Sequence, residues 1–171
     1  MINIQIQDQV IQYSKDLVKK VNFGMRGVFD GTKENQFFGV VAENTIRKYY
    51  GIELMKPKKG WDGGYDFEWN GYKADVKCTI RTVEPKPNFA CNFTELQKNH
   101  IANAFIFTSL NKTNKVLTLC GWIDKKTFFE KAIKFDEGEK IYRSNGTSFP
   151  SSGHHYEIKI LDLKKPFYNF E

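Results

Sequence analysis

The sequence predicts an α/β fold, with a central mixed β-sheet flanked by helices. Three observations predict it. Two helical patterns come first in the chain, and a stretch of period-two alternation interrupted by Asn70-Gly71 follows. A helix and a buried-looking strand, Ala104 to Leu110, come after that stretch. Helices followed by a hairpin and a helix–strand unit are typical of a mixed sheet with helices packed on it.

The N-terminal part of the chain predicts two helices. Apolar residues between about Gln5 and Val21 recur at intervals of three and four residues, which favours an amphipathic helix. A glycine-containing loop from Asn22 to Gly31 leads to a second helix from about Asn35 to Tyr50. Gly51 directly after it is a suitable C-cap, because glycine readily adopts positive φ.

The middle of the chain predicts a hairpin and a helix–strand unit. Residues 61–81 alternate with period two, and the Asn70-Gly71 pair is a strong signal for a two-residue turn. Pro85 and Pro87 should end the second strand. A short helix from about Thr94 to Asn103 then leads into the strand Ala104 to Leu110.

The last third predicts a further strand, a helix and a late strand. A turn at 111–114 precedes a strand from Lys115 to Trp122, and Asp124 should cap a helix that runs to about Phe135. Residues 138–153 form a loop, and His155 to Leu163 alternates as a strand. We expect 1–171 to be one domain, with a core at about 34–110 and residues 115–171 completing the sheet.

Composition limits the classes of protein that this chain can belong to. With 40% hydrophobic and 27% charged residues, the 171-residue chain is neither collagen-like, nor a disulfide scaffold, nor disordered. A net charge of +6 favours an anionic partner such as nucleic acid, although such a charge is also an ordinary route to solubility. The absence of a signal pattern or long apolar run predicts a soluble cytoplasmic protein without a membrane partner.

The hairpin register predicts an acidic site. A two-residue turn with no bulge places Asp66 opposite Asp75, where the two carboxylates would repel each other by about 3 kcal/mol at an effective dielectric constant of about 20. Protonation of one acid, screening by water and Lys77, or a divalent cation would offset this repulsion. The oxygen donors suit Mg²⁺, for which Mn²⁺ can substitute.

Lys77 and Glu43 extend the predicted site. Lys77 follows Asp75 by two residues, so it points from the same face of the strand, and the group could bind a phosphodiester and orient an attacking water. A half-exposed hairpin with solvated charges is the alternative. Glu43 lies among core-facing positions of the second helix, which suggests a partner or a metal-linked role. Its alternative is an exposed ion pair with Arg47.

These residues resemble the pattern of the PD-(D/E)XK nuclease superfamily, which has a restriction-endonuclease-like core. Glu43 matches the helix acid, Asp66 the motif aspartate, and Asp75-Val76-Lys77 the acid-x-Lys tripeptide. Tyr65 stands where the motif has proline. The resemblance covers about 34–110. It implies Mg²⁺-dependent endonucleolytic cleavage of nucleic-acid phosphodiesters, with metal held by the three acids and the Val76 carbonyl, and Lys77 assisting the water.

The resemblance also suggests partners. DNA is the expected substrate, RNA stays open, and a homodimer is open because such enzymes often cut two strands. A noncatalytic nucleic-acid-binding or assembly protein with the same fold is the alternative. His154 and His155, adjacent in a strand, should point to opposite faces. Basic or polar side chains that could contact nucleic acid are Lys56, Lys58, Lys59, Lys73, Arg81, Gln97 and Lys98.

Overall fold

The computed structural model describes residues 1–21, 32–57, 64–143 and 146–166. It contains three α-helices, which are α1 (Asp8–Lys20), α2 (Lys33–Tyr49) and α3 (Lys125–Lys131). The first six strands are β1 (Ile2–Gln5), β2 (Phe67–Trp69), β3 (Tyr72–Arg81), β4 (Ala90–Thr94), β5 (Ala104–Asn111) and β6 (Val116–Asp124). The later strands are β7 (Ile133–Phe135), β8 (Lys140–Tyr142), β9 (Ser148–Pro150) and β10 (His155–Lys159). The described residues also include two 3-10 turns, η2 (Glu95–Gln97) and η3 (Ile160–Asp162).

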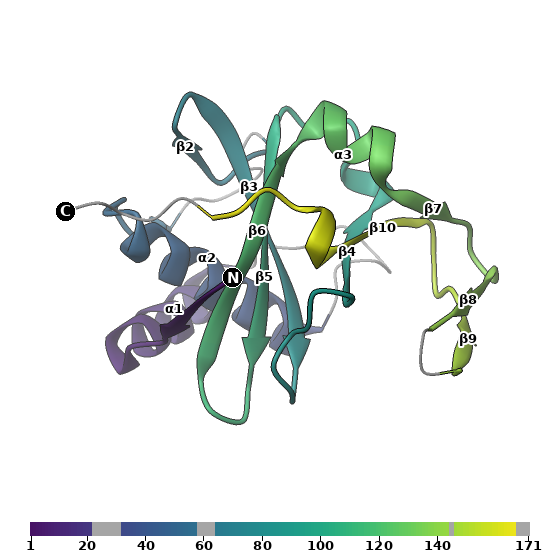
Figure 1. The fold of residues 1–171 in the computed structure, drawn as a ribbon. Helices are drawn as coiled ribbons and strands as arrows, with labels where there is room; N and C mark the ends of the chain where they lie inside the picture. The colour runs from purple at the N-terminus through teal and green to yellow at the C-terminus, as the bar shows by residue number, and fades with distance from the viewer. Residues whose placement is uncertain (22–31, 58–63, 144–145, 167–171) are drawn as a thin grey trace.

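A five-stranded mixed sheet forms the centre of the molecule, as predicted. Its strand order is β1-β6-β5-β3-β2, and β3 and β5 are parallel while the other neighbours are antiparallel. Helices α1 and α2 cover one face of this sheet (Figure 1). Their apolar side chains, including Val10, Val41 and Ile46, pack with Ile106 and Leu117 in the first core. The α/β class is therefore confirmed.

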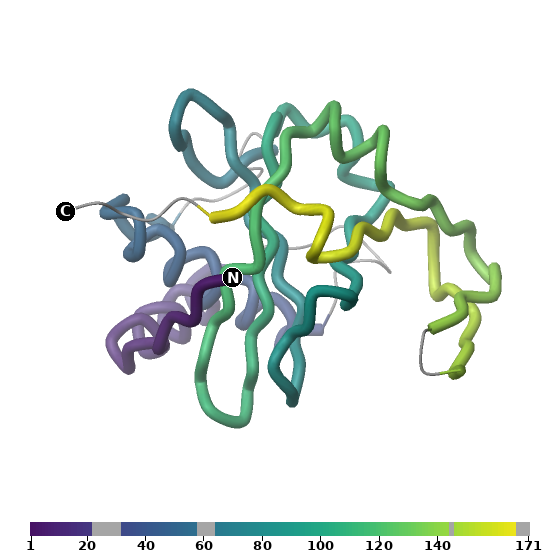
Figure 2. Tube along the Cα trace, in the orientation of Figure 1, coloured from purple at the N-terminus to yellow at the C-terminus, as the bar shows by residue number. Residues whose placement is uncertain are grey.

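A second layer covers the other face of the central sheet. Strands β4, β10 and β7 form a three-stranded antiparallel sheet, and α3 lies beside it (Figure 1). Phe93, Phe105, Phe107 and Phe128 are almost fully buried between the layers and form the centre of the second core. The β8–β9 hairpin stands off the body at one end of this layer (Figure 2).

Several predicted elements are confirmed with small changes at their ends. Helix α2 starts two residues before the predicted boundary, with the Thr32 hydroxyl accepting a hydrogen bond from the Asn35 N–H (3.1 Å). Gly51, just after the helix, has φ +68°, a conformation that favours glycine. Asp124 caps α3 by accepting from the Thr127 N–H at 2.9 Å. The two predicted strands of the β5–β6 pair also form.

The helix predicted from Thr94 to Asn103 is wrong. Residues 90–94 form β4, and only the single 3-10 turn η2 follows. Strand β4 pairs with β10, for example Phe93 with Tyr156. This pairing joins segments far apart in the sequence, so local periodicity could not indicate it. The parallel β3–β5 connection therefore runs through the second layer.

Four further predictions about the bounds and pairing of elements need correction. The first predicted helix begins only at Asp8, because residues 2–5 pair with β6 as β1. Helix α3 stops at Lys131, and the predicted loop 138–153 contains the β8–β9 pair. Of residues 115–171, β6 joins the central sheet as a strand, whereas β10 belongs to the second sheet. The predicted loop at 22–31 and residues 61–63 lie outside the described residues.

Among the described parts of the chain, no helix is both long enough and apolar enough to cross a bilayer.

Candidate functional site

The predicted hairpin forms with the predicted turn. Trp69 pairs with Tyr72, and Phe67 pairs with Ala74. Asn70 and Gly71 have φ values of +48° and +79°, as a type I′ turn requires. The turn therefore fixes which residues of β3 face the first core and which face the second layer.

The hairpin contains a bulge where the sequence predicted a regular register. The paired residues end at Phe67 and Ala74, and the Asp66 N–H also donates to the Ala74 carbonyl (2.8 Å). Two consecutive residues thus face Ala74, an arrangement typical of a β-bulge. The predicted cross-strand pair of Asp66 and Asp75 is therefore wrong. The Tyr65 ring, next to the bulge, packs against the second core.

The bulge brings the Asp66 carboxyl to the edge of β3 that β2 leaves unpaired. Its Oδ2 accepts a hydrogen bond from the Val76 N–H at 2.7 Å, beyond the point where β2 ends. Burial raises the pKa of Asp66 well above its usual range, and the nearby charges of Glu43 and Asp75 raise it further. Lys77 and the Val76 N–H act in the opposite direction. The four predicted catalytic residues are therefore close enough to interact electrostatically.

Asp75 and Lys77 form a close ion pair on the strand face predicted for them. The Lys77 Nζ lies 2.6 Å from each carboxylate oxygen of Asp75. The Asp75 side chain is only 9% exposed and the Lys77 side chain only 15%. The Lys77 Nζ also lies 5.4 Å from the centre of the Phe93 ring. This lysine is therefore held between the acidic site and the second core.

Glu43 combines the two alternatives that its sequence position left open. It is buried, as a core-facing position predicts, and its carboxylate also pairs with Arg47 Nε at 2.6 Å. The Arg47 guanidinium further donates to the backbone carbonyls of Asp66 and Glu53, and it lies over the Phe67 ring. Arg47 therefore connects α2 to the bulge. Its spacing from Glu43 indicated the ion pair, but no sequence pattern indicated the contact with Asp66.

The donor types at this edge fit a hard divalent cation such as Mg²⁺. Three acids face two basic groups, Arg47 and Lys77, which leaves one uncompensated negative charge when Asp66 is ionised. Because the N–H and C=O of a strand residue point to the same side, the Val76 carbonyl is directed to the edge where Asp66 lies. Mg²⁺ needs only one or two carboxylates and keeps several waters.

In the described residues, the carboxylate oxygens of Glu43, Asp66 and Asp75 do not all lie within 4.8 Å of one another. Contact of one cation with all three acids therefore requires side-chain movement. The ion pairs with Lys77 and Arg47 are the contacts that such movement would loosen.

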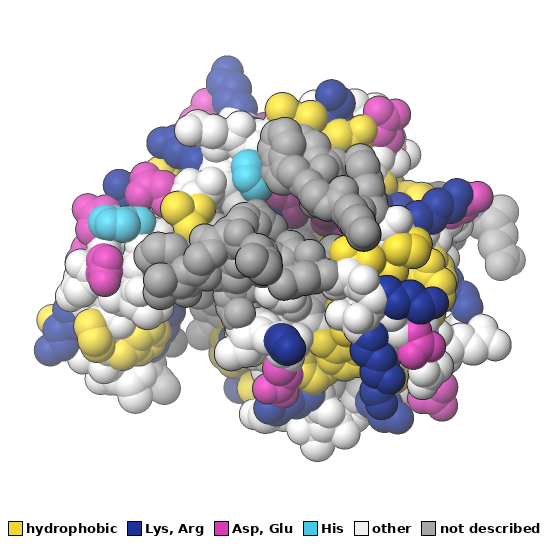
Figure 3. All heavy atoms as spheres, turned by 180° about the vertical axis from the view of Figure 1, so that it is seen from behind, with side chains coloured by type: hydrophobic (Ala, Val, Ile, Leu, Met, Phe, Trp, Pro, Cys, Tyr) yellow, Lys and Arg dark blue, Asp and Glu magenta, His cyan; other side chains and the backbone are white. Residues whose placement is uncertain are grey.

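The lysines predicted to contact nucleic acid differ in their surroundings. Lys56 is 76% exposed and pairs with Glu53 at 2.6 Å, while Lys73 lies over the Tyr65 ring. Lys58 and Lys59 lie outside the described residues. On the face drawn in Figure 3, basic side chains are spread among acidic ones. No single basic patch marks an interface in the described residues of this view.

Arg81, Gln97 and Lys98 differ in their surroundings: the first two are half-buried, and Lys98 is exposed but bonded within the protein. The Arg81 guanidinium donates to the Ala90 carbonyl (2.8 Å) and lies over the Phe89 ring, and its buried Nε has no hydrogen-bond partner among the described residues. Gln97 is half-buried in η2 rather than on an α-helix. The Lys98 Nζ lies 3.2 Å from the Tyr156 hydroxyl. Contact with nucleic acid would require Arg81 and Lys98 to leave these partners.

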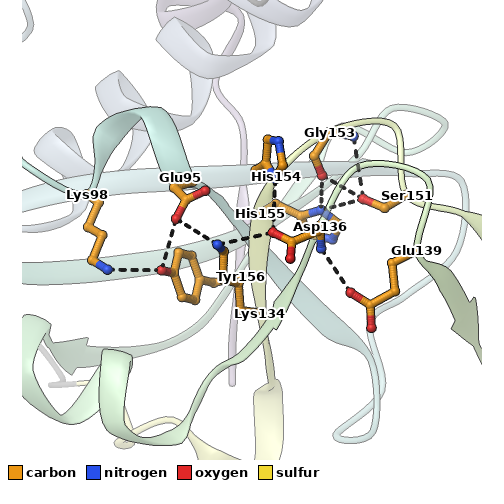
Figure 4. A network of polar contacts seen from close by, with 10 residues as sticks. All are labelled: Glu95, Lys98, Lys134, Asp136, Glu139, Ser151, Gly153, His154, His155 and Tyr156. Carbon is orange, nitrogen blue, oxygen red and sulfur yellow. Dashed lines mark hydrogen bonds and ion pairs between the residues drawn. The ribbon is translucent and has the colours of Figure 1, made fainter.

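A second group of ligand-type side chains lies on the second layer. Oxygen or nitrogen atoms of Glu95, Asp136 and His154 lie within 4.8 Å of one another. The Lys134 ammonium points between the two carboxylates, at 3.2 Å from Glu95 and 3.1 Å from Asp136 (Figure 4). Lys134 thus already supplies the positive charge there. The first site differs from this group, because its three acids face only two basic groups, Arg47 and Lys77.

No protein-family model, curated protein or solved structure matches this chain. The resemblance to the nuclease superfamily therefore rests on the motif residues and on their arrangement.

Proposed function

We propose that the protein is a metal-dependent endonuclease of the PD-(D/E)XK superfamily, with a restriction-endonuclease-like core and DNA as substrate. The observation that carries this proposal is the position of the Asp66 carboxyl. The residue is half-buried, the charges of Glu43 and Asp75 act on its carboxyl, and Lys77 is paired with Asp75. Such a concentration of acids is unfavourable for folding unless a cation or a proton compensates it. Clusters of acids with perturbed pKa values are typical of functional sites.

Each residue has a role that follows from its contacts. Asp66, Asp75 and the Val76 carbonyl would hold Mg²⁺, and Glu43 would join directly or through water. The Mg²⁺ would supply positive charge at the phosphate oxygens and favour attack by water. Lys77 orients Asp75 and, at the same face, can hold the attacking water by a hydrogen bond. Arg47 keeps Glu43 and the backbone of Asp66 in position.

A noncatalytic nucleic-acid-binding protein with the same fold is the second candidate. One observation favours it: Lys77 and Arg47 already neutralise Asp75 and Glu43. A protein in which these pairs never open would keep the fold and the charge but would not hold the cation.

Cleavage assays separate the two candidates. Plasmid DNA, single-stranded DNA and RNA are incubated with the protein in Mg²⁺, Mn²⁺, Ca²⁺ or EDTA. We expect cleavage in Mg²⁺ and Mn²⁺. The Asp75→Ala and Lys77→Ala variants should each cleave about 100-fold more slowly or worse. Lys159→Ala is the matched control, because Lys159 ends the acid-x-Lys tripeptide of β10 and is exposed.

Cleavage that persists in both variants would overturn the proposed site. Binding without cleavage in every metal would instead favour the noncatalytic candidate.

A further inference from the structure

A pocket lies outside the acidic site, between the second sheet and the β8–β9 hairpin. Its volume is about 580 Å³, which is within the range of ligand-binding pockets. Strands β4 and β10 form its floor, and residues of the hairpin form its wall. The face of β4 that lines it is opposite to the face of Phe93, against which Lys77 packs. Strand β4 and its Phe93 ring therefore lie between this pocket, named here the outer pocket, and Lys77.

The charges of the outer pocket compensate one another. Both carboxylate oxygens of Glu157 accept hydrogen bonds from Arg143 at 2.6 Å, and His155 Nε2 lies 3.3 Å from the same carboxylate. At the rim, Glu95 pairs with Lys134. A phosphate would find the guanidinium already occupied. The pocket therefore suits a neutral group.

The wall of the pocket offers flat surfaces. The Arg143 guanidinium lies 4.9 Å from the centre of the Phe149 ring, and its bidentate bond to Glu157 fixes its plane. Phe149 is 44% exposed, and Pro150 lies next to it in the pocket lining. Aromatic rings and guanidinium planes are the surfaces on which nucleobases stack.

The floor of the pocket offers unused hydrogen-bonding groups. Asn92 and Thr94 pair with Glu157 and His155 in the β4–β10 ladder, so all four side chains point to the same face. Both are exposed, and neither side chain has a hydrogen-bond partner within the described part of the chain. An asparagine amide presents a donor beside an acceptor, which matches the edge of a nucleobase.

We propose that the outer pocket binds an unpaired nucleobase of a single-stranded segment of the substrate. The base would stack on the Arg143–Phe149 pair, and Asn92 and Thr94 would contact its edge. This inference rests on the proposed nuclease function and narrows its substrate to nucleic acid that contains unpaired nucleotides. In a base-paired duplex the same edge is engaged with its complement and the ring is stacked between neighbours, so duplex DNA would not fill the pocket.

Fluorescence anisotropy tests this inference. A labelled single-stranded 12-mer, a blunt duplex of the same sequence and a 12-mer of abasic sugars are titrated with the protein in EDTA, which prevents cleavage. We expect the single strand to bind more tightly than the other two. Phe149→Ala and Asn92→Ala should each weaken single-strand binding by about 5-fold or more and leave abasic-strand binding unchanged.

Tyr142→Ala is the matched control, because Tyr142 lies on the same hairpin, is 73% exposed, and points to the opposite face from the buried neighbour Ile141. It should bind the single strand like the wild type. Melting curves establish that each variant is folded. Because Asn92 lies outside the hairpin, the Asn92→Ala variant tests the pocket even if Phe149→Ala alters the hairpin.

The outcomes for the pocket and for the nuclease differ. Folded Phe149 and Asn92 variants that bind the single strand normally would overturn the pocket inference and leave cleavage by the Asp75 site unaffected. Loss of binding in these variants, with no cleavage by the wild type, would support the pocket and overturn the nuclease. If a nucleoside monophosphate binds as tightly as the single strand, the ligand of the pocket is a free nucleotide. This result would overturn the proposal that the pocket binds a base of a single-stranded substrate.

Discussion

Asp66 is an acid whose charge is unfavourable where the fold places it. The residue is half-buried near two other acids, and partial desolvation together with their charges raises its pKa. A folded-state pKa above the unfolded value means that the folded protein holds the proton more tightly. The stability contributed by this proton is full at about pH 4 and below, and it is lost as the pH rises through the folded pKa.

Asp66→Asn should therefore stabilise the metal-free protein. The amide oxygen can still accept the Val76 N–H, but the side chain carries no charge. In EDTA at pH 8, we expect the free energy of unfolding in urea to rise by on the order of 1 kcal/mol or more, with the gain vanishing toward pH 4. Asp162→Asn, at an exposed acid, should change little. Destabilisation at pH 8 that disappears toward acidic pH would instead mean that Asp66 is favourably ionised.

Glu157 shows the opposite behaviour. Burial alone would raise the pKa of Glu157, but the bonds from Arg143 and the contact with His155 outweigh it and hold the pKa below its usual value. This pair stabilises the fold at neutral pH, and its contribution is lost as the pH falls through the depressed folded pKa.

Arg143→Gln should leave a buried, unpaired carboxylate. Removing one partner of a fully buried ion pair lowers the free energy of unfolding by about 3–5 kcal/mol. Because the Arg143 side chain is 31% exposed, we expect a decrease on the order of 2–3 kcal/mol at pH 7. The difference from wild type should shrink at pH 3.5, where Glu157 is protonated in the variant. Urea unfolding at the two pH values measures this, with Lys140→Gln as a control on the same hairpin. An equal loss at both pH values would contradict the electrostatic account.

At the scale of elements, the sequence correctly predicts the turns and helix caps that depend only on residues close together in the chain. The Asn70-Gly71 turn, the helix capped at Gly51 and the cap at Asp124 depend on residues close in sequence, and all three form. Strand β4 depends on pairing with β10, and sequence periodicity wrongly suggested a helix after it.

The candidate site was predictable to a similar extent. The residue types and the face of Asp75 and Lys77 follow from the alternation of β3. The bulge at Asp66 and Phe67 does not, because it depends on where β2 stops pairing and on the Arg47 bond to the Asp66 carbonyl. Such a contact requires α2 to be placed first.

Close packing between elements gives a prediction at β6. A Cβ added to Gly121 would lie 2.6 Å from the Lys164 carbonyl oxygen and 2.8 Å from the Leu163 Cβ. The backbones of Trp122 and Lys164 exchange hydrogen bonds at this point. Gly121→Ala should therefore displace residues 163–164 and cost about 1–3 kcal/mol in urea unfolding.

Gly39→Ala is the matched comparison for this prediction. Gly39 lies inside α2, and a Cβ there would meet nothing within 4 Å. Alanine should raise the free energy of unfolding by about 0.5–1 kcal/mol because it restricts the unfolded chain. Similar effects of the two substitutions would contradict the packing argument.

At the scale of the whole molecule, the net charge of +6 hides an acidic centre. The excess lysine can attract the phosphate backbone, while Asp66, Asp75 and Glu43 concentrate negative charge at one edge of the sheet. Filling this edge with a cation should stabilise the complete fold, because the ligands come from both α2 and the hairpin.

Mn²⁺ at about 100 times its dissociation constant should raise the melting temperature by about 5–10 °C relative to EDTA, since such binding contributes about 2.7 kcal/mol. Differential scanning calorimetry measures the shift. Asp75→Asn should abolish it, and Asp136→Asn, in the second ligand-type group, should retain it. The reverse result would place the cation at Glu95, Asp136 and His154.

Strand β5 has a consequence for how such experiments behave. All eight of its residues, Ala104–Asn111, are buried, and the segment contains neither a charged residue nor proline. When the chain unfolds, this apolar, β-prone window is exposed and can pair with the same window of another chain. We expect heated protein to aggregate through it, so that the melting temperature depends on the scan rate. Recovery of the signal on cooling decides whether a melting curve reports equilibrium or the rate of unfolding.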